Sequence, residues 1–127
     1  MGGTLAGTEL VVLVGGRTVG LPLDDVSEVI ALGDLTPVPG AAAAVRGLVH
    51  LRGQLVPVVD LSSAAFQTPG ADPVAGTPLV VVEAGRPDEP LLRAALTVDR
   101  VVGLGIEAES HLDVAETLFA LRMEKPR

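Results

Sequence analysis

Cysteine, tryptophan and tyrosine are absent from this 127-residue chain, and two phenylalanines supply its only aromatic rings. The lack of cysteine excludes disulfide bonds and thiolate metal sites. No apolar run approaches the roughly 20 residues of a membrane-spanning helix, because glycine, proline or a charge interrupts each one. Lysine and arginine number nine against sixteen acidic residues, and the net charge of -7 opposes phosphate backbones and anionic lipids. We therefore expect neither nucleic acid nor a membrane as a partner.

Apolar residues make up 48% of the chain, which is enough for the core of one domain of this length. The first eight residues, MGGTLAGT, are small, and we expect them to form a flexible tail before a single domain over residues 9–127. The N-terminus does not combine a basic start with the apolar run of a signal peptide. We expect a cytoplasmic protein.

Short strands separated by turn signals dominate the predicted secondary structure. ELVVLV and TVGLPL flank Gly15 and Gly16, a pattern that predicts a β-hairpin. DDVSEVI is predicted to begin as a helical turn capped by Asp24 or Asp25 and to end as a strand. Residues 45–61 predict two more strands, and LVVVEA with LLRAALTVDRVVGLGI predicts two or three further ones. This succession indicates an all-β small barrel or sandwich.

The last part of the chain predicts a helix over residues 111–123. Ser110 is predicted to cap this helix, and Val114, Leu118 and Leu121 fall near one apolar face. The sequence thus predicts an all-β domain that ends in one helix.

No group of residues matches a catalytic, metal or cofactor site. GLGIEA at residues 103–108 fits a dinucleotide-binding turn, but only 19 residues follow it, too few for the rest of such a unit. We interpret its glycines as a bulged strand end. His50 and His111, the latter expected in the first turn of the last helix, lie beside no serine or carboxylate at a relay or metal spacing. We expect no enzyme activity, no cofactor and no metal.

A cationic stripe is predicted within the segment VRGLVHLRGQLVPVVDL, residues 45–61. Alternation along the first strand places on one face Arg46, Leu48, His50 and Arg52. The opposite, apolar face consists of Val45, Val49 and Leu51. Arginine suits bidentate recognition of carboxylates, and a leucine among polar groups is typical of an interface. The stripe predicts a surface for an acidic protein partner, with a solvated outer strand face as the alternative.

The same segment carries a family resemblance. GLPLDDVSEVI, PVPG and especially VRGLVHLRGQLVPVVDL resemble the CheW-like domain, the coupling module of bacterial chemotaxis systems, and LTVDRVVGL resembles its later VD-x-V strand. The run from Gly20 to Leu61 aligns without a gap. The resemblance implies a non-catalytic pair of small SH3-like β-barrels that share a hydrophobic boundary.

The resemblance also implies partners and site residues. Such proteins bridge the cytoplasmic tip of a chemoreceptor, a methyl-accepting chemotaxis protein, to the regulatory domain of a CheA-type histidine kinase; another CheW-like protein is a further candidate partner. Val26 and Glu28 match receptor-contact positions, and Arg52 matches the signature arginine of the coupling surface. Three positions match structural residues of the motif, namely Gly47, Gly53 and Asp60. The family pattern usually has asparagine where this chain has His50.

The resemblance covers residues 9–106 and then stops. Family members continue with a strand pair that completes the first barrel, and the remaining residues here contain no such pair. We expect one incomplete barrel, a helix over its open edge, and weakened or lost kinase binding, as in a C-terminally shortened member of the Frz type from gliding bacteria. The alternatives are a small β-barrel ligand-binding domain and a subunit that needs a partner chain.

Overall fold

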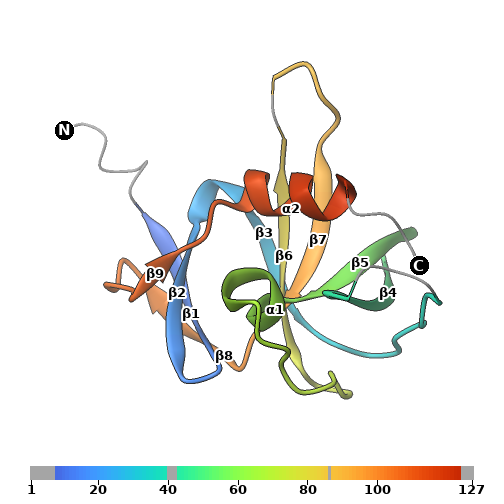
Figure 1. Cartoon of the computed structure of the whole chain (residues 1–127), viewed down its shortest axis with the longest axis horizontal. Helices are drawn as coiled ribbons and strands as arrows, with labels where there is room; N and C mark the ends of the chain where they lie inside the picture. Colours follow the sequence, from blue (N-terminus) through green and yellow to red (C-terminus); the bar gives the residue numbers. More distant parts are fainter. Residues whose placement is uncertain (1–7, 40–42, 86, 124–127) are drawn as a thin grey trace.

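The computed structural model describes residues 8–39, 43–85 and 87–123, and β-strands dominate these ranges (Figure 1). Sheet A has the strand order β8-β1-β2-β9, and sheet B has the order β3-β6-β7-β5-β4. The strands are β1 (Glu9–Val14), β2 (Arg17–Pro22), β3 (Val26–Ala31), β4 (Val45–Leu51), β5 (Gln54–Asp60), β6 (Pro78–Ala84), β7 (Leu92–Thr97), β8 (Arg100–Leu104) and β9 (Ser110–His111). A 3-10 turn, η2 (Leu23–Asp25), and the helices α1 (Leu61–Phe66) and α2 (Val114–Met123) complete the described part.

The all-β fold class with a C-terminal helix is confirmed, whereas the short helix α1 was not predicted. The expected tail lies outside the described residues except for Thr8, whose carbonyl accepts a hydrogen bond from Leu23 N at 3.1 Å. No helix in the described part of the chain is long and apolar enough to cross a membrane.

Sheet A grows from the predicted hairpin of β1 and β2, whose turn residues Gly15 and Gly16 both have positive φ. On one side β8 pairs antiparallel with β1, and on the other β9 pairs parallel with β2. Gly103 lies opposite Val11 while the next pair along β1 skips Val102, so β8 is bulged there. The interpretation of these glycines as a bulged strand end is confirmed.

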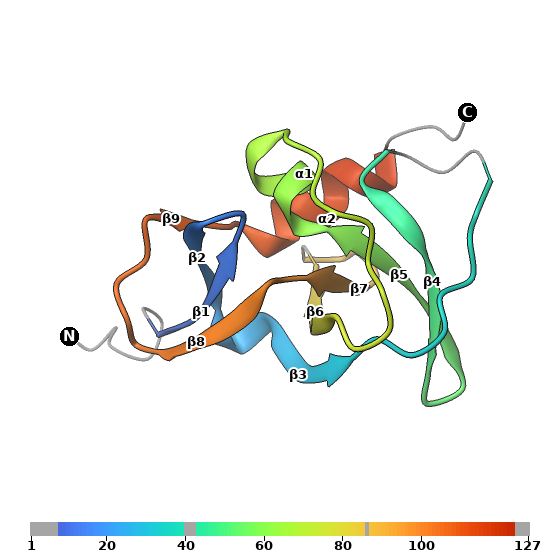
Figure 2. The same cartoon turned by 90° about the horizontal axis from the view of Figure 1, so that it is seen from below.

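Sheet B curls so that its two edge strands, β3 and β4, approach each other (Figure 2). They do not pair as strands, and we call the gap between them the seam. A backbone bridge between Thr36 and Leu48 and an ion pair between Glu28 and Arg52 connect the two sides. The curled sheet encloses an inner cluster of Leu32, Val49, Val56, Val58, Leu79, Val81 and Ala95. Sheet B is therefore an open barrel with its own core.

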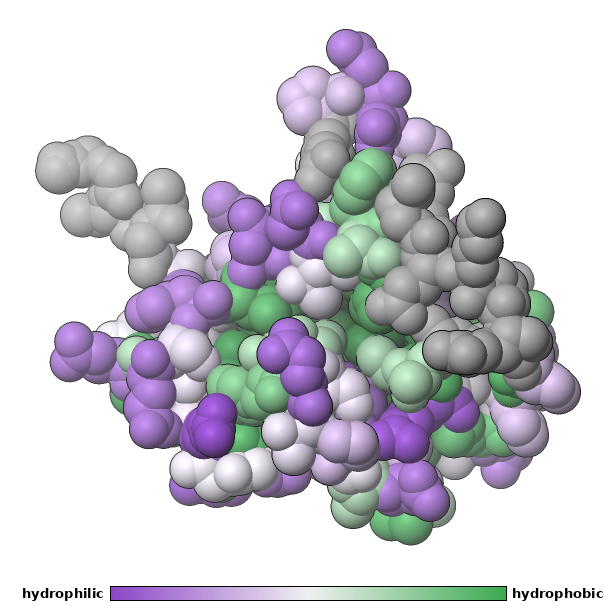
Figure 3. All heavy atoms as spheres, in the orientation of Figure 1, coloured by the Kyte–Doolittle hydropathy of each residue, from purple (hydrophilic) through white to green (hydrophobic). Residues whose placement is uncertain are grey.

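A larger core fills the space between the sheets. Its members come from sheet A, from the outer face of sheet B and from α2, and they include Leu10, Val12, Val14, Val19, Leu21, Val80, Val82, Ala94, Leu96, Val114 and Leu118. Helices α1 and α2 lie over this core, and α2 packs on β6 and β7 (Figure 1). In the space-filling view, apolar residues gather in this central region, and hydrophilic residues gather on the projecting connection between β6 and β7 (Figure 3).

Two expectations about the C-terminal segment are wrong. Ser110 does not cap the helix, because residues 110 and 111 pair with β2 as strand β9. The cap is Asp113, whose carboxylate accepts from Glu116 N at 2.9 Å. The helix also does not cover a sheet edge: its Val114 and Leu118 are buried in the core between the sheets. An apolar face finds more apolar area on a sheet face than along an edge.

Candidate functional site

The turn between β4 and β5 holds Arg52 in an unusual backbone conformation. Arg52 has φ 50 and Gly53 has φ 80, positive at both central residues as in a type I′ hairpin turn. Such turns prefer asparagine, aspartate or glycine, because a side chain at positive φ meets the backbone. The structure thus places a long cationic side chain where the fold favours a small residue.

Arg52 is paired across the seam. Its side chain is 72% exposed, and its guanidinium donates to Glu28 of β3, whose side chain is 21% exposed. The hydrogen bond from Arg52 to Glu28 and the negative charge of Glu28 raise the pKa of Arg52 above its ordinary value. The β3–β6 register shifts between Val26 and Glu28. The structure brings two of the three family-matched positions into contact and places Val26 two residues before Glu28 on the same strand.

The predicted stripe is divided by a β-bulge in β4. Val45 pairs with Val59 and Gly47 pairs with Val58. Arg46 is therefore an extra residue that lies opposite no residue in the backbone register of β5. A bulge shifts the alternation of side chains along its strand. The prediction that Val45 shares a face with Val49 and Leu51 is therefore wrong, and Arg46 does not continue the face of Leu48 and His50.

The outer face of this hairpin is mostly apolar. Cross-strand pairing places the following residues together on it: Val45, Leu48 and His50 from β4, and Leu55, Pro57 and Val59 from β5. Val45, Pro57 and Val59 also line a groove against Leu118 and Leu121 of α2. Leu55 is 56% exposed and His50 is exposed. We call these six residues the hairpin face.

Gly47 lies where a side chain has no room. Its φ is 151, and a Cβ atom would stand 2.6 Å from the Thr36 carbonyl oxygen and 2.9 Å from atoms of the Leu35 side chain. Glycine therefore allows the β3–β4 connection to reach Leu48 and form the bridge that closes one end of the seam.

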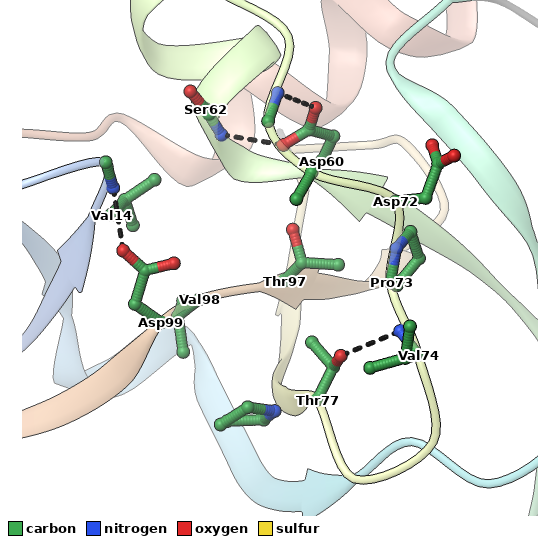
Figure 4. Close-up of a pocket in the computed structure, with 14 residues that line it drawn as sticks. Val14, Asp60, Ser62, Asp72, Pro73, Val74, Thr77, Thr97, Val98 and Asp99 are labelled. Atoms are coloured by element: carbon green, nitrogen blue, oxygen red, sulfur yellow. Dashed lines mark hydrogen bonds between the residues drawn. The ribbon is translucent and has the colours of Figure 1, made fainter.

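Arg46 and Asp60 form a framework contact. Arg46 donates to Asp60 Oδ2 at 2.6 Å and to the Gly70 carbonyl at 3.3 Å. Asp60 also accepts from Ser62 N, Ser63 Oγ and Gly70 N at 3.1, 2.8 and 2.8 Å, so it caps α1 and holds the loop after it (Figure 4). Burial raises the pKa of Asp60, but the hydrogen bonds from Arg46, Gly70 and Ser63 outweigh burial and hold the pKa below its usual range.

Sequence reasoning matched Asp60 to the motif but missed the helix that it caps. An aspartate just before a serine-rich segment is an N-cap signal, and its side chain accepts from Ser62 N two positions on. The ion pair with Arg46 had no sequence signal, since the two residues come from different strands and Arg46 lies at the bulge in their register.

A groove of about 390 Å³ lies beside Asp60, between the β1–β2 turn and the loop before β6 (Figure 4). Two of its side chains are engaged within the protein: Asp99 accepts from Gly15 N at 2.9 Å, and Thr77 Oγ1 accepts from Val74 N at 2.9 Å. Among the described residues, no three histidine, aspartate or glutamate side chains gather in a metal-binding arrangement. The bonds in this groove hold loops together.

The two histidines lie on different sheets. His50 belongs to the hairpin face of sheet B, whereas His111 lies on β9 of sheet A with its Nδ1 2.7 Å from Glu9 Oε1. The expectation that His111 stands in the first turn of the last helix is wrong, because that helix begins at Val114.

Comparison with known proteins agrees with this geometry. The model of the CheW-like domain matches residues 9–110, which include both sheets and end before α2. The chain belongs to the CheW-like domain family. The resemblance seen in the sequence is confirmed, and the chain is a member of a family of non-catalytic chemotaxis scaffold and adaptor proteins.

Two relatives give the extent of the likeness. Chemotaxis protein CheW from Thermotoga maritima is 37% identical over 46 residues, which are 36% of this chain and 30% of that protein. The crystal structure of scaffolding protein TtCheW from Thermoanaerobacter tengcongensis matches with a TM-score of 0.64 and 25% identity, over 80% of this chain and 66% of that chain. The chain therefore spans less than two thirds of the length of either relative.

Proposed function

We propose that this chain is a cytoplasmic, non-catalytic signalling adaptor that binds the cytoplasmic tip of a chemoreceptor through Val26, Glu28 and Arg52. The observation that carries the proposal is the exposed guanidinium of Arg52, held at positive φ and paired with Glu28 across the seam. Strained backbone of this kind costs of order 1 kcal/mol or more, and such residues cluster at functional sites. Glycine or asparagine would form this turn more easily, so recognition explains the arginine better than folding does.

The ion pair suits the capture of a polar partner. Glu28 orients the guanidinium, which retains donors for a carboxylate of the receptor because it has five N–H groups in all. Arginine is one of the residue types that dominate protein interfaces, and the guanidinium of Arg52 is largely exposed.

The hairpin face supports a second contact. We propose that Leu48 and His50, with the exposed Leu55, bind the regulatory domain of a CheA-type kinase or another CheW-like protein. Arg46 has no part in this proposal, because its guanidinium is engaged by Asp60 and Gly70. We further propose that kinase binding is weak, because sheet A ends in the two-residue strand β9, and α2 packs on β6 and β7, where a strand pair is expected to complete a family barrel. Membership of the shortened Frz type stays a prediction.

Reversing the charge of Arg52 tests the receptor contact. Arg52→Glu is expected to weaken binding to a purified receptor tip by about 30-fold or more, because truncating a central interface arginine commonly costs about 2 kcal/mol. Arg100→Glu is the matched control: it makes the same change in charge at an exposed arginine of β8, away from the seam. Both variants should keep the circular dichroism of the parent. Equal receptor affinity of Arg52→Glu and the parent would refute the proposal.

A further inference from the structure

The seam of sheet B is a slot with two closed ends. The bridge between Thr36 and Leu48 closes one end, and the ion pair between Glu28 and Arg52 closes the other. Between these ends lies a groove of about 300 Å³. One side is formed by the end of β3 and the segment after it, residues 30–34, and the other by Val49 and His50 of β4. This volume is at the lower limit of ligand sites in proteins, so the slot has room for a short segment.

Backbone groups of both edge strands face into the slot. Leu48 exchanges two hydrogen bonds with Thr36 on this side, at 2.8 and 2.9 Å. Alternate residues of an antiparallel strand direct their N–H and C=O groups to the same side, so those of His50 also face the slot. On the other edge, Leu32 N donates to the Thr77 carbonyl on the β6 side at 2.8 Å, so the backbone groups of Ala31 point the opposite way, toward the slot.

These inward-facing groups have no partner in the described part of the chain. No bond from another described residue reaches the seam-side N–H or C=O of Ala31 or His50. A free pair of strand edges is a template for a further strand, and natural proteins normally cover or blunt it. The slot therefore presents the pattern of donors and acceptors that an extended backbone satisfies.

The floor and rim of the slot set the chemistry of the side chains that fit it. The floor includes the buried apolar residues Leu32, Val49 and Leu79. The rim carries the exposed carboxylate of Asp34, for which no ion pair is found among the described residues. The chain as a whole has a net charge of -7. An apolar floor below an acidic rim favours a segment with apolar residues that face inward and a basic residue that faces outward.

We propose that the seam binds an extended peptide segment of a partner protein, with a basic residue beside Asp34, as an added strand between β3 and β4. Main-chain hydrogen bonds supply the affinity in this mode of recognition, and the alternating side chains supply the specificity. The distance along β4 from Leu48 to Arg52 limits the inserted part to about three or four residues at roughly 3.3 Å per residue. This site adjoins the proposed receptor contact at the Glu28–Arg52 pair, but it binds a different ligand through other residues and goes beyond that contact.

Titration with designed peptides tests the site. The probe is the peptide acetyl-Thr-Val-Lys-Val-Thr-amide, and the comparison peptide has glutamate in place of its lysine. Each peptide is added to isotope-labelled protein, and the amide chemical shifts of the protein are followed by NMR. The amides of Ala31 and His50 are expected to shift most. The lysine peptide is expected to bind about fivefold more tightly than the glutamate peptide.

Two variants separate backbone from charge recognition. Ala31→Pro removes the seam-side N–H, and proline is tolerated at such a position of an edge strand. This variant should bind the lysine peptide about fivefold more weakly than the parent. Ala31→Ser keeps the N–H and should bind the lysine peptide as tightly as the parent. Asp34→Asn changes an exposed side chain and should abolish the preference for lysine. If Ala31→Pro does not fold, Asp34→Asn decides. No saturable binding of the lysine peptide, or no loss of its preference in Asp34→Asn, would overturn the proposal.

Discussion

Sheets A and B bury apolar residues in different ways. Sheet B curls around an inner cluster made of its own residues and those of the connection after β3. Sheet A has no enclosed core of its own in the described chain: its inward residues pack against the outer face of sheet B and against the two helices. A curled sheet supplies its own interior, whereas an open sheet depends on whatever covers it. The features proposed for recognition, Glu28, Arg52 and the seam, all belong to sheet B.

The difference explains how the fold accommodates a C-terminal segment unlike the expected strand pair. Strand β9 covers only two positions of β2, Val19 and Gly20, and α2 then supplies buried side chains to the shared core. Helix α2 packs on β6 and β7 of sheet B and contributes to the core that the two sheets share, while the docking residues on sheet B are held by the bulge in β4, the Thr36–Leu48 bridge and the Arg46–Asp60 pair.

The largest expected effect comes from removing the carboxylate that anchors sheet B to α1. Asp60→Ala is expected to lower the free energy of unfolding by about 3–5 kcal/mol, because it leaves Arg46 without its ion-pair partner and several donors unbonded. Denaturant unfolding measures the loss. Asp72→Ala is the control, because it removes another carboxylate near Arg46, one that is exposed and lies 3.5 Å from the guanidinium. This substitution should lower the free energy of unfolding by less than about 1 kcal/mol. Similar losses for both would show that the buried network adds little.

A smaller effect, confined to one sheet, is expected from the helix. Leu118→Ala should cost about 2–4 kcal/mol, as for other buried leucines, and should lower hydrogen-exchange protection in β7, on which α2 packs, more than in β1 and β2. Ala120→Ser, an exposed change on the same helix, is the control. Equal loss of protection in both sheets would contradict the packing of α2 on sheet B.

The smallest expected effect is a dependence on pH. The pKa of Asp60 is lower in the folded protein than in the unfolded chain, so folding favours its charged form. Its contribution is complete above the unfolded pKa of about 4 and is lost as the pH falls through the folded pKa, at a rate of at most about 1.4 kcal/mol per pH unit. Unfolding of the parent and of Asp60→Asn, compared from neutral pH down to below pH 4, measures it. Parallel curves for the two proteins would contradict the assignment.

The sequence predicted best what depends on local patterns. The β1–β2 hairpin followed from a glycine pair between two apolar runs, and the bulged end of β8 followed from Gly103 within a strand. The resemblance motif identified positions 26, 28 and 52 as a group, and two of them meet across the seam.

What the sequence could not predict depends on tertiary pairing. The bulge at Arg46 changes which residues share a face. Gly47 within β4 is a local signal of a bulge, but a glycine alone does not say which residue is left unpaired. Ser110 is a good helix cap in isolation, but two hydrogen-bonding positions on β2 were available to residues 110 and 111, and the helix began at the next suitable cap, Asp113. In both cases a partner distant in sequence outweighed a local preference.

Parallel titrations against two partners test the central claim, that sheet B carries receptor recognition while the altered C-terminal segment after β8 weakens kinase recruitment. The protein is titrated against a chemoreceptor tip and, separately, against the regulatory domain of a CheA-type kinase from the same organism. The account predicts saturable receptor binding at least about tenfold tighter than kinase binding. Comparable tight binding to both partners, or binding to the kinase domain alone, would contradict it.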